Sequence, residues 1–160
     1  MFNVGDTVMY KGHGLVKIVG KARKNFDGID EDYYVLRSAR SPMVQTKMMV
    51  KASGAEKVLR YPMGEDEAKG IVEVLGETPA ELPDDPKERM QILDEVLERN
   101  DVREFATLVK DYRESVLLNF ERSEIKRIKA ISRNLAEELC YVLKTNRASL
   151  RGKLFVKPAG

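Results

Sequence analysis

The spacing of apolar residues changes near residue 60, and this change limits what the chain can fold into. Before it, short runs rich in Val, Ile, Tyr and Met are separated by Gly, Pro and Ser, which is the pattern of antiparallel strands. Asp27-Gly28 lies between two such runs and is typical of a hairpin turn. The predicted strands cover residues 6–10, 15–24, 32–38, 43–50 and 56–60. Short strands this close together predict a small, bent, five-stranded antiparallel barrel.

From about residue 64, apolar residues recur every three or four positions, which predicts helices. A short helix is expected over 64–76, and longer ones over 87–99, 101–118 and 123–144. Asp101 with Glu104 resembles a capping box, and Ser123 is a candidate N-cap. The prolines of 78–86 predict a linker between helices.

Together these patterns predict an α+β protein with two domains, a barrel over residues 1–62 and a helical domain of about four to five helices over 63–160. The helical domain ends in a basic tail with no acidic residue. Its cations are Lys144, Arg147, Arg151, Lys153 and Lys157. A solvated tail is the favoured interpretation, and a tail that contacts phosphates is the alternative.

The Gly12-His13-Gly14 triplet is the first candidate for chemistry. A phosphate-binding loop leads from a strand into a helix, but a β-branched run follows this triplet, so a turn is expected. His13 is the only histidine and Cys140 the only cysteine, which leaves no ligand set for a metal and no catalytic triad. We therefore expect no cofactor, no metal and no enzymatic activity. A hydrolase that uses barrel carboxylates is the remaining enzymatic alternative, and no sequence motif supports it.

Localisation is also constrained by the sequence. No apolar run approaches the roughly 20 residues that span a bilayer, and "MFNVGD" lacks the pattern of a secretory signal. A single cysteine forms no internal disulfide, which favours a reducing compartment. We expect a cytoplasmic protein with no membrane partner and no small-molecule substrate.

The stretches "FNVGDTVMYKGHGLVKIVG" and "DYYVLR" resemble the N-terminal module of the CarD/CdnL family of bacterial transcription regulators. The same module occurs as the RNA polymerase-interacting domain of transcription-repair coupling factor. In the helical half, "NDVREFATLVKDY" and "FERSEIKRIKAISRNLAEEL" are similar to further segments of the family. The resemblance implies a Tudor-like barrel that docks on the RNA polymerase β subunit. It also implies a helical domain at the upstream edge of the promoter bubble, where it contacts DNA non-specifically and stabilises open complexes.

The resemblance also implies site residues. Run 43–50 is the candidate edge strand for polymerase docking, with contacts from Gln45, Thr46 and Lys47. Lys24 lies near a position where the family carries a basic residue that contacts polymerase. The candidate DNA contacts are Lys87, Arg89, Lys126, Arg127, Lys129 and Arg133. Ordinary solvated charge is the alternative for each of these residues.

The chain departs from the family at the tryptophan that acts as its DNA wedge, because it contains no tryptophan. The wedge position falls at or near Pro86. Pro86 or Leu82 could insert between bases, but a proline also suits the first position of a helix. The adjacent Asp84 and Asp85 would repel phosphates. The sequence therefore favours polymerase docking over a promoter wedge.

One alternative comes from a different class of protein. "GDTVMYKGHGLVKIVG" also resembles a KOW-type RNA-binding motif, which would make the barrel an RNA-binding module. The acidic stretch "FDGIDEDYY" in the same barrel counts against this hypothesis.

Overall fold

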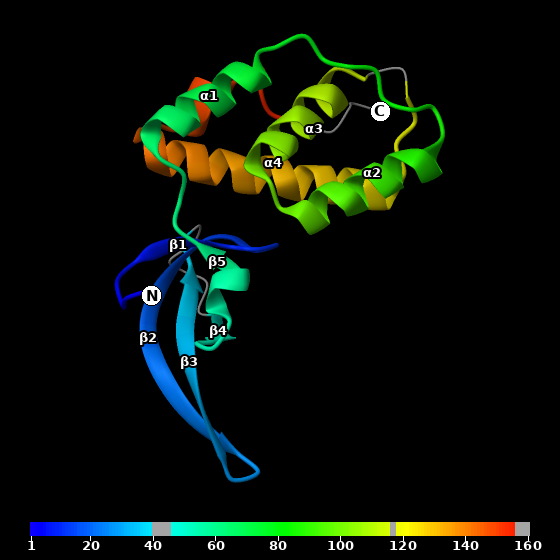
Figure 1. Cartoon of the computed structure of the whole chain (residues 1–160). Helices are drawn as coiled ribbons and strands as arrows, with labels where there is room; N and C mark the ends of the chain where they lie inside the picture. Colours follow the sequence, from blue (N-terminus) through cyan, green and yellow to red (C-terminus); the bar gives the residue numbers. More distant parts are fainter. Residues whose placement is uncertain (40–45, 116–117, 156–160) are drawn as a thin grey trace. The chain divides into compact units, whose positions relative to one another are not determined.

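The computed structural model describes residues 1–39, 46–115 and 118–155 (Figure 1). The chain divides into two compact units, Met1–Pro62 and Met63–Gly160. A five-stranded antiparallel sheet forms the first unit and helices form the second, which confirms the predicted α+β class. No helix in the described ranges has the length and apolar character that crossing a membrane requires.

The sheet of the first unit has the order β4-β3-β2-β1-β5, with antiparallel neighbours throughout. Its strands are β1 (Thr7–Tyr10), β2 (Gly14–Phe26), β3 (Ile29–Ser38), β4 (Lys47–Lys51) and β5 (Leu59–Arg60). The described strands β4 and β5 form its two edges and do not pair with each other, so the predicted closure into a barrel stays a prediction. The core of this unit includes Val8, Val16, Ile18 and Leu36, which are fully buried.

The β2–β3 hairpin extends past the other strands (Figure 1). Phe26 pairs with Ile29 across a two-residue loop, in which Asp27 has φ 51° and Gly28 has φ 82°. Two successive positive φ values define the turn that matches the natural twist of a hairpin, and Gly adopts them at little cost. The predicted hairpin is therefore confirmed.

The last predicted strand is shorter than expected. Residues Ala55–Lys57 form a 3₁₀ helix, η1, and only Leu59–Arg60 pair with β1. Gly54, with φ 80°, precedes this turn and reverses the chain, and Ala55 is buried at 2% exposure. Burial of Ala55 in a compact turn thus replaces the extended backbone that the apolar run had suggested.

The second unit contains α1 (Glu65–Leu75), α2 (Pro86–Arg99), α3 (Val102–Glu114), α4 (Arg122–Leu143) and the 3₁₀ helix η2 (Arg147–Leu150). Helices α1, α2 and α3 all contact α4, the longest helix (Figure 1). Their apolar stripes meet in one core that includes Ile71, Leu93, Val109, Ile128 and Leu139.

The helix starts agree with the sequence at one position and differ at another. Asp101 caps α3, because its carboxylate accepts hydrogen bonds from the backbone N–H of Arg103 (2.8 Å) and of Glu104 (3.1 Å). The reciprocal half of the predicted capping box does not form, because the Glu104 carboxylate accepts from Arg99 Nε instead. The prediction for Ser123 is wrong: α4 begins earlier, with Glu121 as N-cap. The backbone N–H of Glu121 donates to Glu124 Oε1 at 2.9 Å. This capping-box interaction fixes the start of the helix before Ser123.

The C-terminal segment corrects the solvated-tail interpretation. Leu150, Leu154 and Phe155 are buried in the helical core. The backbone N–H of Phe155 donates to Ser132 Oγ at 3.1 Å, and Arg113 Nη1 donates to the carbonyl of Lys153 at 2.7 Å. Three large apolar side chains thus fold this basic segment back onto the helices, while Lys157 lies outside the described residues.

Candidate functional site

Strand β4 is the candidate docking edge. It pairs with β3 from Arg37↔Lys47 to Tyr33↔Lys51, and no described strand pairs with its other side. Thr46, just before the strand, and Lys47 are exposed, whereas Gln45 lies outside the described residues. A free edge offers backbone N–H and C=O groups to an incoming strand, and its lysines discourage indiscriminate pairing. The structure therefore brings Thr46 and Lys47 together at a surface suited to strand addition.

Lys24 lies elsewhere on the sheet. It is exposed on β2, directly opposite Glu31 in the hairpin. Strand β3 separates β2 from β4, and β4 reaches along β3 only as far as Tyr33. Lys24 therefore belongs to the protruding part of the hairpin, beyond the end of the β4 edge.

A row of exposed cations follows one face of α4, and we call Arg122, Lys126, Lys129 and Arg133 the α4 basic stripe. None of them forms an ion pair with another described residue. Their spacing of four, three and four positions places them on one face, over roughly 16 Å at the usual helical rise. The structure thus brings together three predicted DNA contacts and adds Arg122, which its spacing from Lys126 would have revealed.

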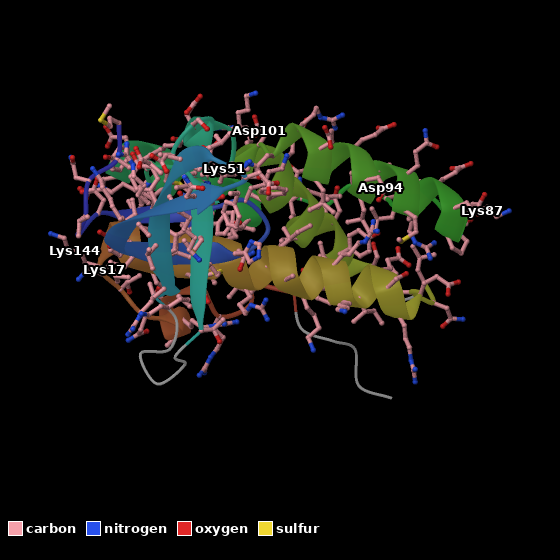
Figure 2. The ribbon with its side chains drawn as sticks, turned by 90° about the horizontal axis from the view of Figure 1, so that it is seen from below. Lys17, Lys51, Lys87, Asp94, Asp101 and Lys144 are labelled. Atoms are coloured by element: carbon pink, nitrogen blue, oxygen red, sulfur yellow. The ribbon has the colours of Figure 1, made fainter. Side chains whose placement is uncertain are left out.

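Two further predicted DNA contacts differ from the stripe. Arg127 is on α4 but pairs with Asp94 of α2 through its Nη1 atom. Lys87 is exposed in the first turn of α2 and points away from the helix (Figure 2). Lys87 therefore remains accessible, whereas Arg127 is held by a carboxylate.

The structure contradicts the prediction for Arg89, which is only 1% exposed. Its Nε donates to Glu124 Oε2 at 2.6 Å and its Nη2 to Glu124 Oε1 at 3.2 Å. Its remaining hydrogen bonds go to the carbonyls of Pro83 (3.0 Å), Asp84 (2.8 Å) and Asn119 (3.1 Å). Arg89 lies on the face of α2 that also buries Leu93, so it is a core residue with no access to phosphates.

Tyr112 completes this buried network, because its hydroxyl donates to Glu124 Oε2 at 2.7 Å. Burial acts to raise the pKa of Glu124, but the hydrogen bonds from Arg89 and Tyr112 outweigh it and hold that pKa below its ordinary value. Burial and the bond to Glu124 raise the pKa of Tyr112. The network is therefore an ionised carboxylate with a neutral phenol and a guanidinium, and it links the start of α4 to the segment before α2.

The expected wedge position has a structural explanation. Pro86 is the first residue of α2, and the side chain of Asp85 caps the helix by accepting from the backbone N–H of Lys87 at 3.0 Å. Asp84 and Asp85 are exposed beside it, and Leu82 packs against the helical core. Both Leu82 and Pro86 are half-buried, and the place of Pro86 at the start of a helix is sufficient to explain it without a wedge.

The Gly12-His13-Gly14 triplet forms the predicted turn between β1 and β2, with φ 80° at Gly12 and 89° at Gly14. The ring of His13 stacks on Tyr10 with the centroids 4.2 Å apart. Among the described residues, no group of three or more His, Cys, Asp or Glu side chains is arranged to hold a metal ion. Cys140 is half-buried, and burial raises the pKa of its thiol.

One comparison with known proteins bears on these surfaces. Residues 2–62 match the family model described as the CarD-like/TRCF RID domain. The matched range corresponds to the first unit, which carries the β4 edge and the β2–β3 hairpin. The family resemblance stated from the sequence is thereby confirmed for this unit.

Proposed function

We propose, from the premise that the first unit belongs to the CarD-like/TRCF RID domain family, that this chain is a non-enzymatic transcription regulator that binds RNA polymerase. The contact we propose is strand addition to the β4 edge by the polymerase β subunit. The observation that carries the proposal is the free edge of β4 within the matched range, with Thr46 and Lys47 exposed beside it. A Tudor-like closure of the sheet, and action in the cytoplasm, belong to the same proposal.

The second unit is proposed to contact promoter DNA through the α4 basic stripe. Its four cations lack described carboxylate partners and match the requirement for non-specific phosphate contacts. The chain has no tryptophan, and Pro86 is engaged as the first residue of a helix. We therefore propose that it modulates open complexes by electrostatic contact at the upstream edge of the bubble, without inserting a wedge.

Binding of the full chain to purified polymerase β subunit tests the docking step. Lys47→Glu should weaken binding about threefold to tenfold, since a charge at the rim of an interface contributes about 1 kcal/mol. The matched control is Lys11→Glu, which makes the same change at an exposed position just after β1, on the far side of β2 and β3 from the β4 edge. Equal affinity for both variants and the wild type, or no binding by the wild type, would reject the β4 edge.

Salt titrations of binding to a duplex and to a melted promoter fragment test the second step. Replacing Lys126, Lys129 and Arg133 together by Gln should lower the slope of log K against log salt by about three, close to one per phosphate contact. Lys69→Gln is the control, because Lys69 pairs with Glu65 on α1. An unchanged slope would exclude the α4 basic stripe as the DNA contact. If the triple variant keeps its affinity for RNA, the KOW-like alternative would be favoured instead.

A further inference from the structure

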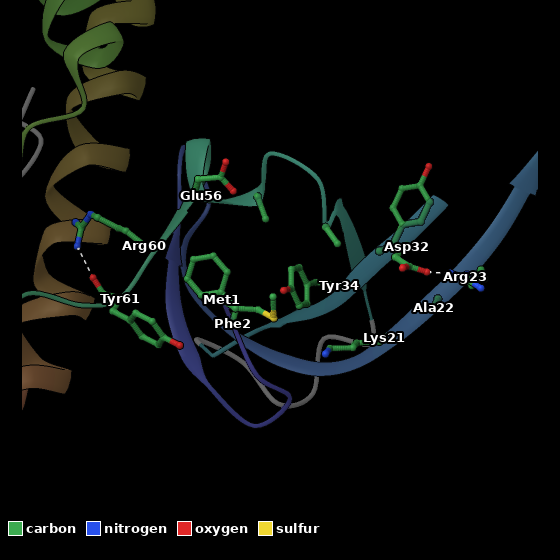
Figure 3. A pocket seen from close by; sticks show the side chains of 13 residues that line it. Met1, Phe2, Lys21, Ala22, Arg23, Asp32, Tyr34, Glu56, Arg60 and Tyr61 are labelled. Atoms are coloured by element: carbon green, nitrogen blue, oxygen red, sulfur yellow. Dashed lines mark hydrogen bonds and ion pairs between the residues drawn. The ribbon is translucent and has the colours of Figure 1, made fainter. Parts of the chain in front are cut away.

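A groove of about 950 Å³ lies on the concave side of the β2–β3 hairpin (Figure 3). It exists because β2 and β3 stay paired as far as Phe26↔Ile29, well past the ends of β1 and β4. The β2–β3 register shifts between Ile18 and Gly20, and such bulges bend and twist a strand pair. Neither the β4 edge nor the α4 basic stripe uses this surface.

Aromatic rings form one wall of the groove. Phe2 packs edge-on against Tyr34, with ring centroids 6.0 Å apart, and against Tyr61 at 5.3 Å. Phe2 and Tyr34 are buried at 8% and 5% exposure, so their positions are fixed by the core. The hydroxyl of Tyr61 donates to Asp6 Oδ2 at 2.6 Å, which holds the more exposed ring in place.

Two small side chains in the lining leave the space open. Ala52 follows β4, and Ala55 begins η1. The resulting volume falls within the range of about 300–1,000 Å³ that is usual for ligand pockets. Pockets of this kind combine an apolar lining with a few polar groups that fix orientation, so the charged side chains decide what the groove accepts.

Lys21 is a cation of the groove for which no carboxylate partner is described. Its Nζ atom lies 5.9 Å from the centroid of the Tyr34 ring, on the side of the apolar space (Figure 3). By contrast, Arg23 pairs with Asp32 at 2.9 Å, and Arg60 turns away and donates to the carbonyl of Tyr61. The groove therefore offers an aromatic wall beside the positive charge of Lys21.

We propose that this groove binds a segment of a partner protein in which a large apolar side chain adjoins a carboxylate. The apolar side chain packs against Phe2, Tyr34 and Tyr61, and the carboxylate pairs with Lys21. Glu56 also lines the groove and repels the repeated charges of a nucleic acid more strongly than a single carboxylate. The proposal is independent of polymerase docking, because the groove and the β4 edge share no residue.

The test is an NMR titration of the ¹⁵N-labelled full chain with two matched probes, N-acetyl-Phe-Glu amide and N-acetyl-Phe-Gln amide. Amide shifts should cluster at Lys21, Tyr34, Ala52, Ala55 and Tyr61. Ligands this small should bind with a Kd of about 1–10 mM. The Glu probe should bind about twofold to fivefold more tightly than the Gln probe, as expected for one exposed ion pair.

Substitutions separate the charge from the shape of the groove. Lys21→Gln should remove the preference for the Glu probe, while Lys17→Gln, on the same strand outside the groove, should keep it. Ala52→Leu should block both probes by filling the space. Lys21→Gln changes only an exposed side chain and should leave the fold intact. It therefore tests the proposed ion pair even if Ala52→Leu disturbs folding.

Three outcomes would overturn the proposal. They are an absence of shifts at the groove with probes at about ten times the expected Kd, equal affinity of the wild type for both probes, or tighter binding of a short single-stranded oligonucleotide at the same amides. The last outcome would assign the groove to nucleic acid rather than to a protein segment.

Discussion

Glu124→Gln is expected to destabilise the helical unit by about 3–5 kcal/mol, the usual cost of breaking a buried ion pair. Four donors share the two oxygens of this carboxylate: Arg89 Nε, Arg89 Nη2, the hydroxyl of Tyr112 and the backbone N–H of Glu121. An amide replaces one oxygen by a donor, so two of these hydrogen bonds are lost. At about 1.5–3 kcal/mol for each bond to a charged group, the loss agrees with the ion-pair figure.

Urea unfolding followed by far-UV circular dichroism measures this change, because the helices dominate the signal. Asp94→Asn is the matched control: it removes the partner of Arg127 between the same two helices, and that exposed pair should contribute less than about 1 kcal/mol. A double-mutant cycle with Arg89→Met should give a coupling of about 2 kcal/mol or more. A loss for Glu124→Gln no larger than that of the control, or strictly additive single variants, would refute the reasoning.

The remaining predictions concern pH, the wedge position and the C-terminal segment. The folded pKa of Glu124 lies below its ordinary value of 4.5. Its contribution to stability is therefore complete above pH 4.5 and is lost as the pH falls through the folded pKa. The urea midpoint of Glu124→Gln should fall less on acidification than that of the wild type. Pro86→Ala should leave DNA affinity and open-complex lifetime unchanged, and a loss of more than about threefold in a filter-binding assay would show that the proline is used as a wedge. Phe155→Ala should lower the stability of the helical unit by about 3–5 kcal/mol in calorimetry, whereas a solvated tail would give no change.

Features encoded by neighbouring residues could be predicted from the sequence. The Asp27-Gly28 turn and the Asp101 cap depend on two to four consecutive residues, and both are present, although Glu104 does not complete the predicted capping box. The helical periodicity of α4 likewise placed Lys126, Lys129 and Arg133 on one face.

Features that join distant segments could not be predicted. In the sequence Arg89 looks like any surface charge, because its partner Glu124 lies 35 residues later. Leu150 and Phe155 lie in a segment too short to show a period, so the basic residues around them dominated the interpretation. The groove combines side chains from residues 2, 21, 34, 52 and 61, which no local pattern connects.

The burial of Leu154 and Phe155 also bears on the order in which the chain folds during synthesis. The first unit has all its strands once Arg60 has emerged from the ribosome, so it can fold while the rest of the chain is still being translated. The helical unit lacks part of its core until Phe155 is available, because that ring contacts Tyr112 and Phe120. The surface proposed to bind polymerase would then be ready before the helical unit is complete, and a nascent chain stalled late in translation would already present it.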